Sequence, residues 1–331
     1  MAISLADIKK LRDITGAGMM DVKKALEEAN GDFEAAKDLL RKRGQAIAAK
    51  RSDREASEGC VLAKAENGFA AIVALKCETD FVAKNADFVA LTKQILDLAM
   101  ANKPADLEAL KAITVNGLTV AELITERSGV TGEKMELSDY AFLEGACVDA
   151  YNHLGNKLAS IVLFAEADAP IEPVHGVAMQ VAAMNPLALD ADHISEEVKA
   201  RELAVNIDKT KAEEVQKFVE NALRKAGINP AHVDSDDHIE SNMAKGWITA
   251  EDAAKAREIK ASAAAEAEAN LEKQAKKIEM ISQGRLQKYF KENTLMDQIY
   301  VGNDDKLPVK EFLAKNKITC LDFKRITLNQ E

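Results

Sequence analysis

Cysteine and aromatic residues are scarce in this chain of 331 residues, and so are long apolar runs. Aromatic side chains make up 5% of it, with one tryptophan, and there are only four cysteines. The cysteines are scattered without a C-x-x-C pair, which is typical of a reduced cytoplasm and not of a disulfide framework. No apolar run approaches the length of a membrane span, and the start MAISLADIKK is typical of a capped helix, not of a signal peptide. We therefore expect a cytoplasmic protein without membrane contact.

Positive charge is also in deficit. Lys and Arg number 44 against 55 Asp and Glu, which gives a net charge of −11. This excess argues against general binding of nucleic acids, because such binding needs a positive field that releases phosphate counterions. Residues 1–54 are the exception, since they hold 12 basic and 9 acidic residues. Its 331 residues are enough for two or more domains, and with 47% hydrophobic and 30% charged residues the chain is predicted to be a soluble globular protein.

Motifs for nucleotides, metals and catalysis are absent from the sequence. There is no G-x-x-x-x-G-K-[ST] or G-x-G-x-x-G motif, and GVTGEK at 129–134 lacks the spacing and the preceding apolar strand. The five histidines show no metal-ligand spacing. His232 and His238 flank acidic residues at 234–237, which leaves a metal site open, although a solvated turn is the simpler interpretation. We expect no cofactor, no metal and no enzyme, although catalytic triads need not be local in sequence.

The first residues predict a small domain of three helices at 1–45. Ser4 and Asp32 are placed to cap the first and third helices. Asn30-Gly31 is a typical stop for the second helix. The charged stretch 46–59 is predicted to be a linker.

Two β-hairpins indicate a core of mixed helices and strands. Asn67-Gly68 joins two strand-like runs, and this dipeptide is the strongest short signal for a hairpin turn. The sequence HLGN at 153–156 joins a second pair of runs. The first half of this core is expected at 60–144, and the second half at 145–194 and 284–331. Further elements are expected as helices at 86–103, near 173–184, at 285–293 and at 308–315, and as strands at 135–145, near 296–301 and at 318–328.

Residues 195–283 differ from this core, because they are charged, rich in Ala, Glu and Lys, and almost without strand formers. Helices at 195–226 and about 250–283 predict an inserted helical hairpin or coiled coil. Its periodicity is too irregular to predict a long heptad seam. The expected fold class is therefore α+β, with an N-terminal three-helix domain, a two-part core and an inserted helical arm.

The stretch TGAGMMD at 15–21 is a candidate binding element. Met19 and Met20 are adjacent at a helix start, so their side chains point about 100° apart. A small three-helix core can hardly bury both completely. Either one methionine is a core residue with an incidental neighbour, or the two form an adaptable contact surface with Arg12 at its rim.

The stretch CETDFVAKN at 77–85 is the second candidate, because Phe81 and Val82 lie where a polar loop is expected. Asp80 is placed to cap a short helix, with Phe81 in its first turn. Phe81 is then either one more core residue or an apolar contact for something outside this chain. The sequence of this stretch alone favours the core residue.

A resemblance to a known family decides between these alternatives. TGAGMMDVKKALEEANGDFEAAKDLLRKRG resembles, almost residue for residue, the N-terminal module of the elongation factor Ts family. CETDFVAKN, about sixty residues later, resembles the family's second signature. EGACVDAYNHLGNKLASIVLF and the GRLQKYF and ITCLDFKRITL segments resemble its core. The resemblance covers roughly 1–207 and 271–328.

The resemblance implies a ubiquitin-associated-like N-terminal domain and a role in translation elongation. The protein would bind elongation factor Tu–GDP and promote GDP release and exchange for GTP by disturbing the magnesium and nucleotide site. The partner would be contacted at its GTPase domain and its third domain. Such an exchange factor needs no catalytic residue and no cofactor.

The resemblance also implies a set of partner-binding residues, which are Arg12, Met19, Met20, Asp80, Phe81, Val82 and His153. The first three would contact the GTPase domain, and Asp80 and Phe81 would enter beside its magnesium and nucleotide site. The histidine lies at the tip of the second hairpin and matches a histidine at the family's partner interface.

Two departures from the family pattern and two rival interpretations remain. Residues 208–270 look like an enlargement of the helical insertion, which leaves the oligomeric state open between a monomer, a homodimer and a two-plus-two complex with the partner. The chain is also expected to lack an extra C-terminal module found in some members. The first rival is a ubiquitin-associated-type adaptor, in which only the N-terminal helices matter and no exchange occurs. The second is an enzyme that uses the Asp- and His-rich region 232–240 and would hold a metal.

Overall fold

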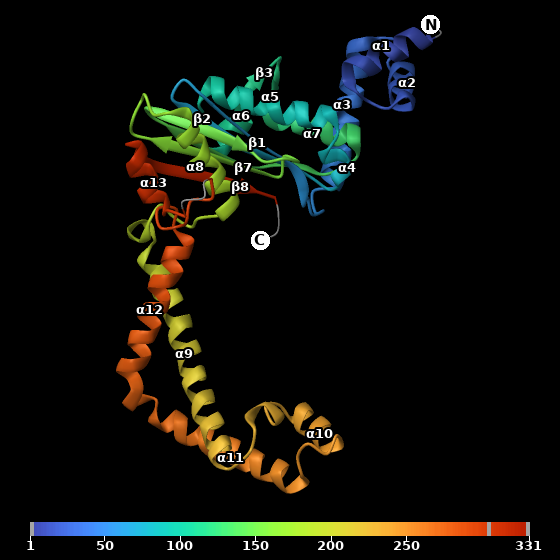
Figure 1. Ribbon diagram of the computed structural model, residues 1–331. Helices are drawn as coiled ribbons and strands as arrows, with labels where there is room; N and C mark the ends of the chain where they lie inside the picture. Colours follow the sequence, from blue (N-terminus) through green and yellow to red (C-terminus); the bar gives the residue numbers. More distant parts are fainter. Residues whose placement is uncertain (1–2, 303–305, 329–331) are drawn as a thin grey trace. The chain divides into compact units, whose positions relative to one another are not determined.

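The computed structural model describes residues 3–302 and 306–328 (Figure 1). The chain divides into two compact units, one within Met1–Leu189 and Gln298–Glu331 and the other within Asp190–Asp297. The first unit combines helices with small antiparallel sheets, and the second is built from helices. The fold class is therefore α+β, as predicted. The outer limits of the predicted domains, residues 1 and 331, lie outside the described residues.

Three helices begin the first unit, and they are α1 (Leu5–Thr15), α2 (Met19–Glu28) and α3 (Phe33–Lys50). The side chains of Ser4 and Asp32 cap α1 and α3, as predicted. Leu11 and Leu26 are fully buried in the small core between the helices. Helix α3 continues to Lys50, into the residues predicted to be a linker. The likeness to ubiquitin-associated domains remains a prediction.

The second half of α3 packs on α7 (Val120–Thr131). Two glycines meet where the helices cross, since a Cβ atom on Gly129 would lie 2.2 Å from the Cα atom of Gly44. Arg41 adds ion pairs to Glu122 and Glu126 at 2.9 and 3.3 Å. The close approach of two backbones thus joins the N-terminal helices to the core, and it explains the glycine in the middle of α3.

Two three-stranded antiparallel sheets form the centre of this unit. Their orders are β1-β2-β5 and β6-β7-β8, and a small ribbon pairs β3 with β4. Asn67 and Gly68 both have positive φ in the turn between β1 and β2, which confirms the predicted hairpin. The second predicted hairpin is β6–β7. The strands are β1 (Glu58–Glu66), β2 (Phe69–Cys77), β3 (Thr114–Val115), β4 (Leu118–Thr119), β5 (Met135–Glu144), β6 (Cys147–Asn152), β7 (Leu158–Phe164) and β8 (Cys320–Thr327).

The unit is layered as helices, sheet, sheet and helix. Helices α5 (Ala86–Asn102), α6 (Leu107–Ala112) and α7 bury Phe88 and Ile95 against Phe69 on one face of the first sheet. Its other face meets the second sheet, where Ile72 and Ile161 share one cluster. Helix α8 (Ile171–Met184) covers the far face of the second sheet. Because the two sheets are packed between helices, the turns that follow their strands are held in defined positions.

The second unit consists of long helices with short connections. Two predictions here are wrong. The helix expected at 250–283 is interrupted at 271–274, and its last part continues through Gly284, where the helix was expected to end. A glycine costs an exposed helix only about 1 kcal/mol, so packing overrides it. The elements are α9 (Glu196–Lys225), α10 (Asp236–Ala244), α11 (Ala250–Asn270) and α12 (Ala275–Asn293), with 3₁₀ turns at Ala191–His193, Pro230–His232 and Glu272–Gln274.

The return of the chain to the first unit also differs from expectation. The strand expected near 296–301 is only a single bridge between Ile299 and Pro308. Helix α13 (Val309–Asn316) and strand β8 then follow as predicted. Tyr300 stacks on Phe312 with ring centroids 3.8 Å apart, and its N–H donates to the Leu307 carbonyl at 2.8 Å, so stacking and local backbone hydrogen bonds hold this segment.

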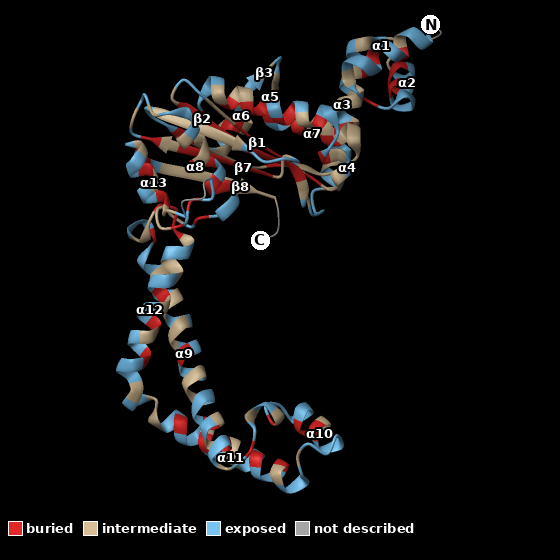
Figure 2. Cartoon of the chain, in the orientation of Figure 1, coloured by how far each residue is buried: buried red, intermediate tan, exposed pale blue. Residues whose placement is uncertain are grey.

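The second unit holds its own apolar core. Val219 and Leu223 of α9 pack with Ile239 of α10 and Ala253 of α11. Figure 2 shows buried positions in both α10 and α11. The outer part of the predicted arm is therefore a small folded module and more than a polar extension.

Candidate functional site

The feature that stands out in the first unit is Phe81, whose side chain is 84% exposed. It lies on the four-residue helix α4 (Asp80–Ala83), directly after strand β2. The core position at this end is occupied by Ala83 and by Phe88 of the next helix, both of which are buried. The interpretation of Phe81 as a core residue is therefore wrong. Val82 is half-buried and packs against the core cluster under the first sheet.

Helix α4 is capped by Thr79, not by Asp80 as predicted. The Thr79 hydroxyl accepts a hydrogen bond from the Val82 backbone N–H at 3.4 Å, and Asp80 is the first helical residue. Both residue types are good caps, so the sequence could not rank them. Threonine wins here because its hydroxyl also donates to the Glu133 carboxylate at 2.6 Å, across 54 positions of the chain.

The backbone before α4 is fixed by charged groups that sequence reasoning did not identify. The Glu78 carboxylate accepts a hydrogen bond from the Lys134 backbone N–H at 2.6 Å, and ion pairs from Arg51 and Arg54 at 3.2 and 3.0 Å. Burial disfavours the charged form of Glu78, but these donors outweigh that effect and hold the pKa of its carboxyl below the ordinary value. Glu78 therefore stays ionised and joins the chain after α3 to the Phe81 segment.

Asp80 is a charged residue beside the exposed ring. Its carboxylate pairs with Lys84 Nζ at 2.7 Å. This hydrogen bond lowers the pKa of the Asp80 carboxyl, and the charge of Lys157 adds to the effect. Asp80 thus carries a negative charge at neutral pH, on an exposed ion pair that a partner can replace at small cost.

His153 is exposed in the turn between β6 and β7, next to Leu154, which is 92% exposed. Its ring nitrogen Nδ1 lies 3.0 Å from the Tyr151 hydroxyl. Asn152 fastens the turn to β1, because its side-chain amide exchanges hydrogen bonds of 2.7 and 2.9 Å with the backbone of Ala63. The turn is therefore held firmly against the first sheet.

The turn and α4 lie at the same end of β1. Lys157, just after the turn, forms an ion pair of 2.8 Å with Glu58, the first residue of β1. Its charge also reaches Asp80, and α4 contacts β1. The structure therefore places the exposed residues after β2 and the tip of the second hairpin against the same strand, β1.

The methionine pair occupies a separate place, at the start of α2. Met19 and Met20 are 49% and 65% exposed, so the interpretation of one as a core residue is wrong. Ile14 and Arg12, in the last turn of α1, are exposed as well. All four side chains are therefore accessible to a partner.

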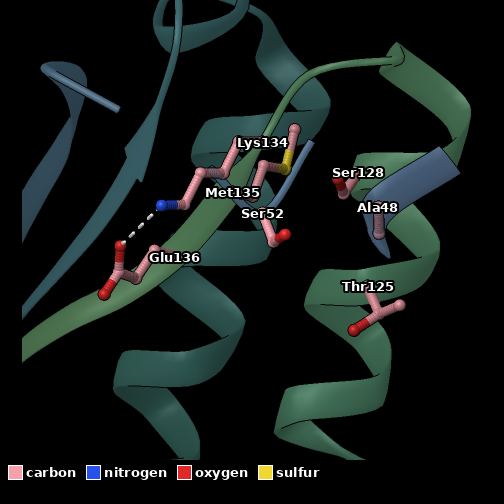
Figure 3. Close-up of a pocket in the computed structure, with 7 residues that line it drawn as sticks. All are labelled: Ala48, Ser52, Thr125, Ser128, Lys134, Met135 and Glu136. Carbon is pink, nitrogen blue, oxygen red and sulfur yellow. Dashed lines mark ion pairs between the residues drawn. The ribbon is translucent and has the colours of Figure 1, made fainter. Parts of the chain in front are cut away.

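A pocket of about 320 Å³ lies where the end of α3 approaches α7 and β5. Figure 3 shows its lining, in which Lys134 pairs with Glu136 at 3.7 Å. Its hydroxyl groups come from Ser52, Thr125 and Ser128, and neither histidine nor cysteine lines it. The pocket marks the junction between the N-terminal helices and the core.

The histidines and cysteines that could serve metal binding or covalent chemistry lie in other surroundings. His238 Nδ1 pairs with Asp234, and the His232 ring lies 5.8 Å from that of Trp247. Within 3–302 and 306–328, no three His, Cys, Asp or Glu side chains are grouped to hold a metal ion. Burial raises the pKa of the Cys60 thiol to about 11 and those of Cys77 and Cys320 to about 12, so these three stay protonated.

Comparison with known proteins agrees with this architecture. Residues 78–330 match the family model described as elongation factor TS. The chain is 57% identical to the elongation factor Ts of Bacteroides fragilis, 58% identical to that of Phocaeicola vulgatus and 44% identical to that of Porphyromonas gingivalis. The fold and these matches define the class of protein, which is a translation elongation factor. The chain belongs to the elongation factor Ts family.

The alignments with these relatives cover 100% of this chain and 100% of each relative. These alignments therefore extend through the helical insertion, residues 208–270 included. None of the helices in the described ranges is both long and apolar enough to cross a membrane.

Proposed function

We propose that this protein binds elongation factor Tu in its GDP form and promotes the release of GDP and its exchange for GTP. The observation that carries the proposal is the 84% exposure of Phe81 on a short helix held by charged hydrogen bonds. A large apolar side chain in this setting is suited to insertion into a partner. Asp80 and Phe81 enter beside the partner's magnesium and nucleotide site, with Val82 supporting them from the core side.

The energetics of such an exchange need no acid, base or metal from this chain. A factor that binds the nucleotide-free partner more tightly than the loaded one weakens nucleotide binding by the same factor. Burial of a phenylalanine removes about 150–250 Å² from water, which is worth roughly 4–6 kcal/mol as an upper bound. That free energy is enough to support a rearrangement around the magnesium ion, and the negative charge of Asp80 adds repulsion toward phosphate groups.

The remaining predicted residues contribute to affinity. Met19 and Met20 offer flexible side chains that adapt to a partner surface, and Arg12 adds a charge at the rim. We assign these three to the GTPase domain of elongation factor Tu. His153 and its turn belong to the same partner-binding surface as α4. This protein also contacts the third domain of elongation factor Tu. As a translation factor, the protein works in the cytoplasm.

The test is the release of fluorescent GDP from the cognate elongation factor Tu, with and without catalytic amounts of this protein. We expect a large acceleration that depends on Phe81. The rival adaptor would bind ubiquitin-like folds through the N-terminal helices and would be indifferent to Asp80 and Phe81. Unchanged GDP release in the presence of the folded protein would exclude the exchange function.

A further inference from the structure

We propose that Glu133 is a positioning residue for nucleotide exchange, because its carboxylate fixes the turn from which Phe81 projects. This inference rests on the proposed exchange function. Glu133 lies between α7 and β5, far from Phe81 in the sequence, and acts on Phe81 through Thr79.

One carboxylate satisfies three donors of the turn. Glu133 Oε1 accepts from the Thr79 hydroxyl at 2.6 Å, and Oε2 accepts from the backbone N–H groups of Thr79 and Glu78 at 3.1 and 3.2 Å. Hydrogen bonds to a charged acceptor are roughly twice as strong as neutral ones. Glu133 therefore accepts the hydrogen bonds of the turn at the point where β2 ends and α4 begins.

Glu133 is itself held in place from two directions. Its backbone carbonyl accepts a hydrogen bond from the Ser128 hydroxyl, and its N–H donates to Thr131 Oγ1 at 3.3 Å. The Glu133 carboxylate accepts from the Glu78 N–H, and the Glu78 carboxylate accepts in the opposite direction, from the Lys134 N–H at 2.6 Å. Residues 78–79 and 133–134 thus form a reciprocal clasp, in which each side supplies a carboxylate and a backbone donor.

The clasp matters because α4 is too short to be stable alone. Nucleation of a helix is unfavourable, and a helix of four residues forms too few backbone hydrogen bonds to offset that free energy. Its cap depends on Glu133, since the Thr79 hydroxyl gives its hydrogen to this carboxylate and keeps a lone pair for the Val82 N–H. With α4 held rigidly, insertion of Phe81 moves the partner and not the short helix.

The test replaces the carboxylate by an amide of the same shape, Glu133→Gln. The amide keeps one acceptor oxygen and adds two donors, so at least one bond to the turn is lost. We expect hydrogen exchange at the Ala83 and Lys84 amides of α4 to rise about tenfold in the free protein, and GDP release at saturating protein to fall about tenfold. Glu136→Gln is the matched control, because it makes the same change three positions away on an exposed side chain of β5.

A double variant shows whether Glu133 acts through Phe81. If it does, Glu133→Gln causes little further loss of exchange when Phe81→Ala is already present. Losses that multiply in the double variant, or a single Glu133→Gln variant with unchanged GDP release, would overturn the inference. If Glu133→Gln does not fold, Thr79→Val removes the shortest bond from the other side and carries the same expectations.

The outcome also separates this inference from the proposed function. If the unaltered protein fails to release GDP, the exchange function is wrong, and the amide exchange rates in α4 still test the clasp. If the unaltered protein releases GDP through Phe81 while Glu133→Gln behaves like Glu136→Gln in both assays, only the positioning role is wrong.

Discussion

Helix α4 and the start of α2 both expose large apolar side chains in the first unit, and they are held in different ways. Phe81 projects from α4, whose turn is fixed by carboxylates on both sides. Met19 and Met20 begin α2, where Gly18 is the N-cap and makes no side-chain hydrogen bond. A rigid ring on a braced turn can displace groups of a partner, whereas flexible methionines can adapt to its surface. We propose that the first region holds a residue for the exchange step and the second holds residues for affinity.

The change expected to have the largest effect is Phe81→Ala. We expect exchange to fall about tenfold or more, because truncation of a central aromatic contact costs about 2 kcal/mol or more of binding. The midpoint of thermal unfolding should change little, because the side chain is exposed. A buried phenylalanine would instead cost about 3–5 kcal/mol of stability. A thermal melt paired with a GDP-release assay measures both.

The matched control for Phe81→Ala is Ile171→Ala, which removes an apolar side chain of similar exposure (83%) at the start of α8. This control should release GDP normally. A Phe81→Ala variant that melts far lower, yet releases GDP normally per folded molecule, would falsify the assignment.

The second change acts on the other side of the comparison. Met19→Ala with Met20→Ala should weaken binding of elongation factor Tu about tenfold, since each truncation removes roughly 0.5–1 kcal/mol of contact. GDP release at saturating protein should remain near the normal rate, because these residues do not act in the exchange step. Titration of the exchange rate against protein concentration distinguishes the two effects. Met280→Ala changes an exposed methionine of the second unit and serves as the control.

A reduced rate at saturation in the double methionine variant would contradict this division of roles. Full removal of the N-terminal helices is a poorer test, because α3 continues to Lys50 and packs on α7 through Gly44 and Gly129. Such a truncation would disturb the core as well as the contact surface.

The third change, Asp80→Ala, should reduce exchange about three- to tenfold through loss of one charged contact. The structure sharpens the stability expectation. Thr79, and not Asp80, is the cap of α4, so the helix keeps its cap and loses only an exposed ion pair with Lys84. Asp87→Ala is the control, because it removes an acidic residue from the first turn of the neighbouring helix α5. Normal exchange with Asp80→Ala would limit the role in exchange to the ring of Phe81.

The sequence predicted those parts of the fold that local chemistry determines. Asn67-Gly68 predicted the first hairpin because both residues tolerate the positive φ of its turn. Ser4 and Asp32 predicted two helix starts because their side chains cap the backbone. In each case the interaction lies within a few residues of the signal.

The sequence did not predict features that depend on distant residues. Thr79 was overlooked as a cap because its partner Glu133 is 54 positions away. The exposure of Phe81 follows from Ala83 and Phe88 filling the core below it, which no local pattern reveals. The residues alone made Phe81, Met19 and Met20 candidates, and only the resemblance to a family favoured partner binding over a place in the core.

The smallest effect is expected from the second unit, and its structure shows where to cut. Removal of 208–270 would take away Thr210 and Glu213, the partners of Arg285 on α12, and would leave that side chain unpaired. Replacing 218–270 by a Gly-rich turn keeps these partners and removes the outer core of Val219, Leu223 and Ile239 as a whole. We expect GDP release within about twofold of normal, because every predicted contact residue lies in the first unit.

The intact chain offers a second measurement of the same point. Its only tryptophan, Trp247, is exposed in the second unit, with Lys245 Nζ 5.0 Å from its ring centroid. Because exposed tryptophan fluorescence responds to a change in polarity, a partner that covers this module would shift the emission. We expect no shift when elongation factor Tu binds. A clear shift, together with lost exchange in the shortened variant and unchanged circular dichroism of the core, would make the second unit part of the partner-binding surface.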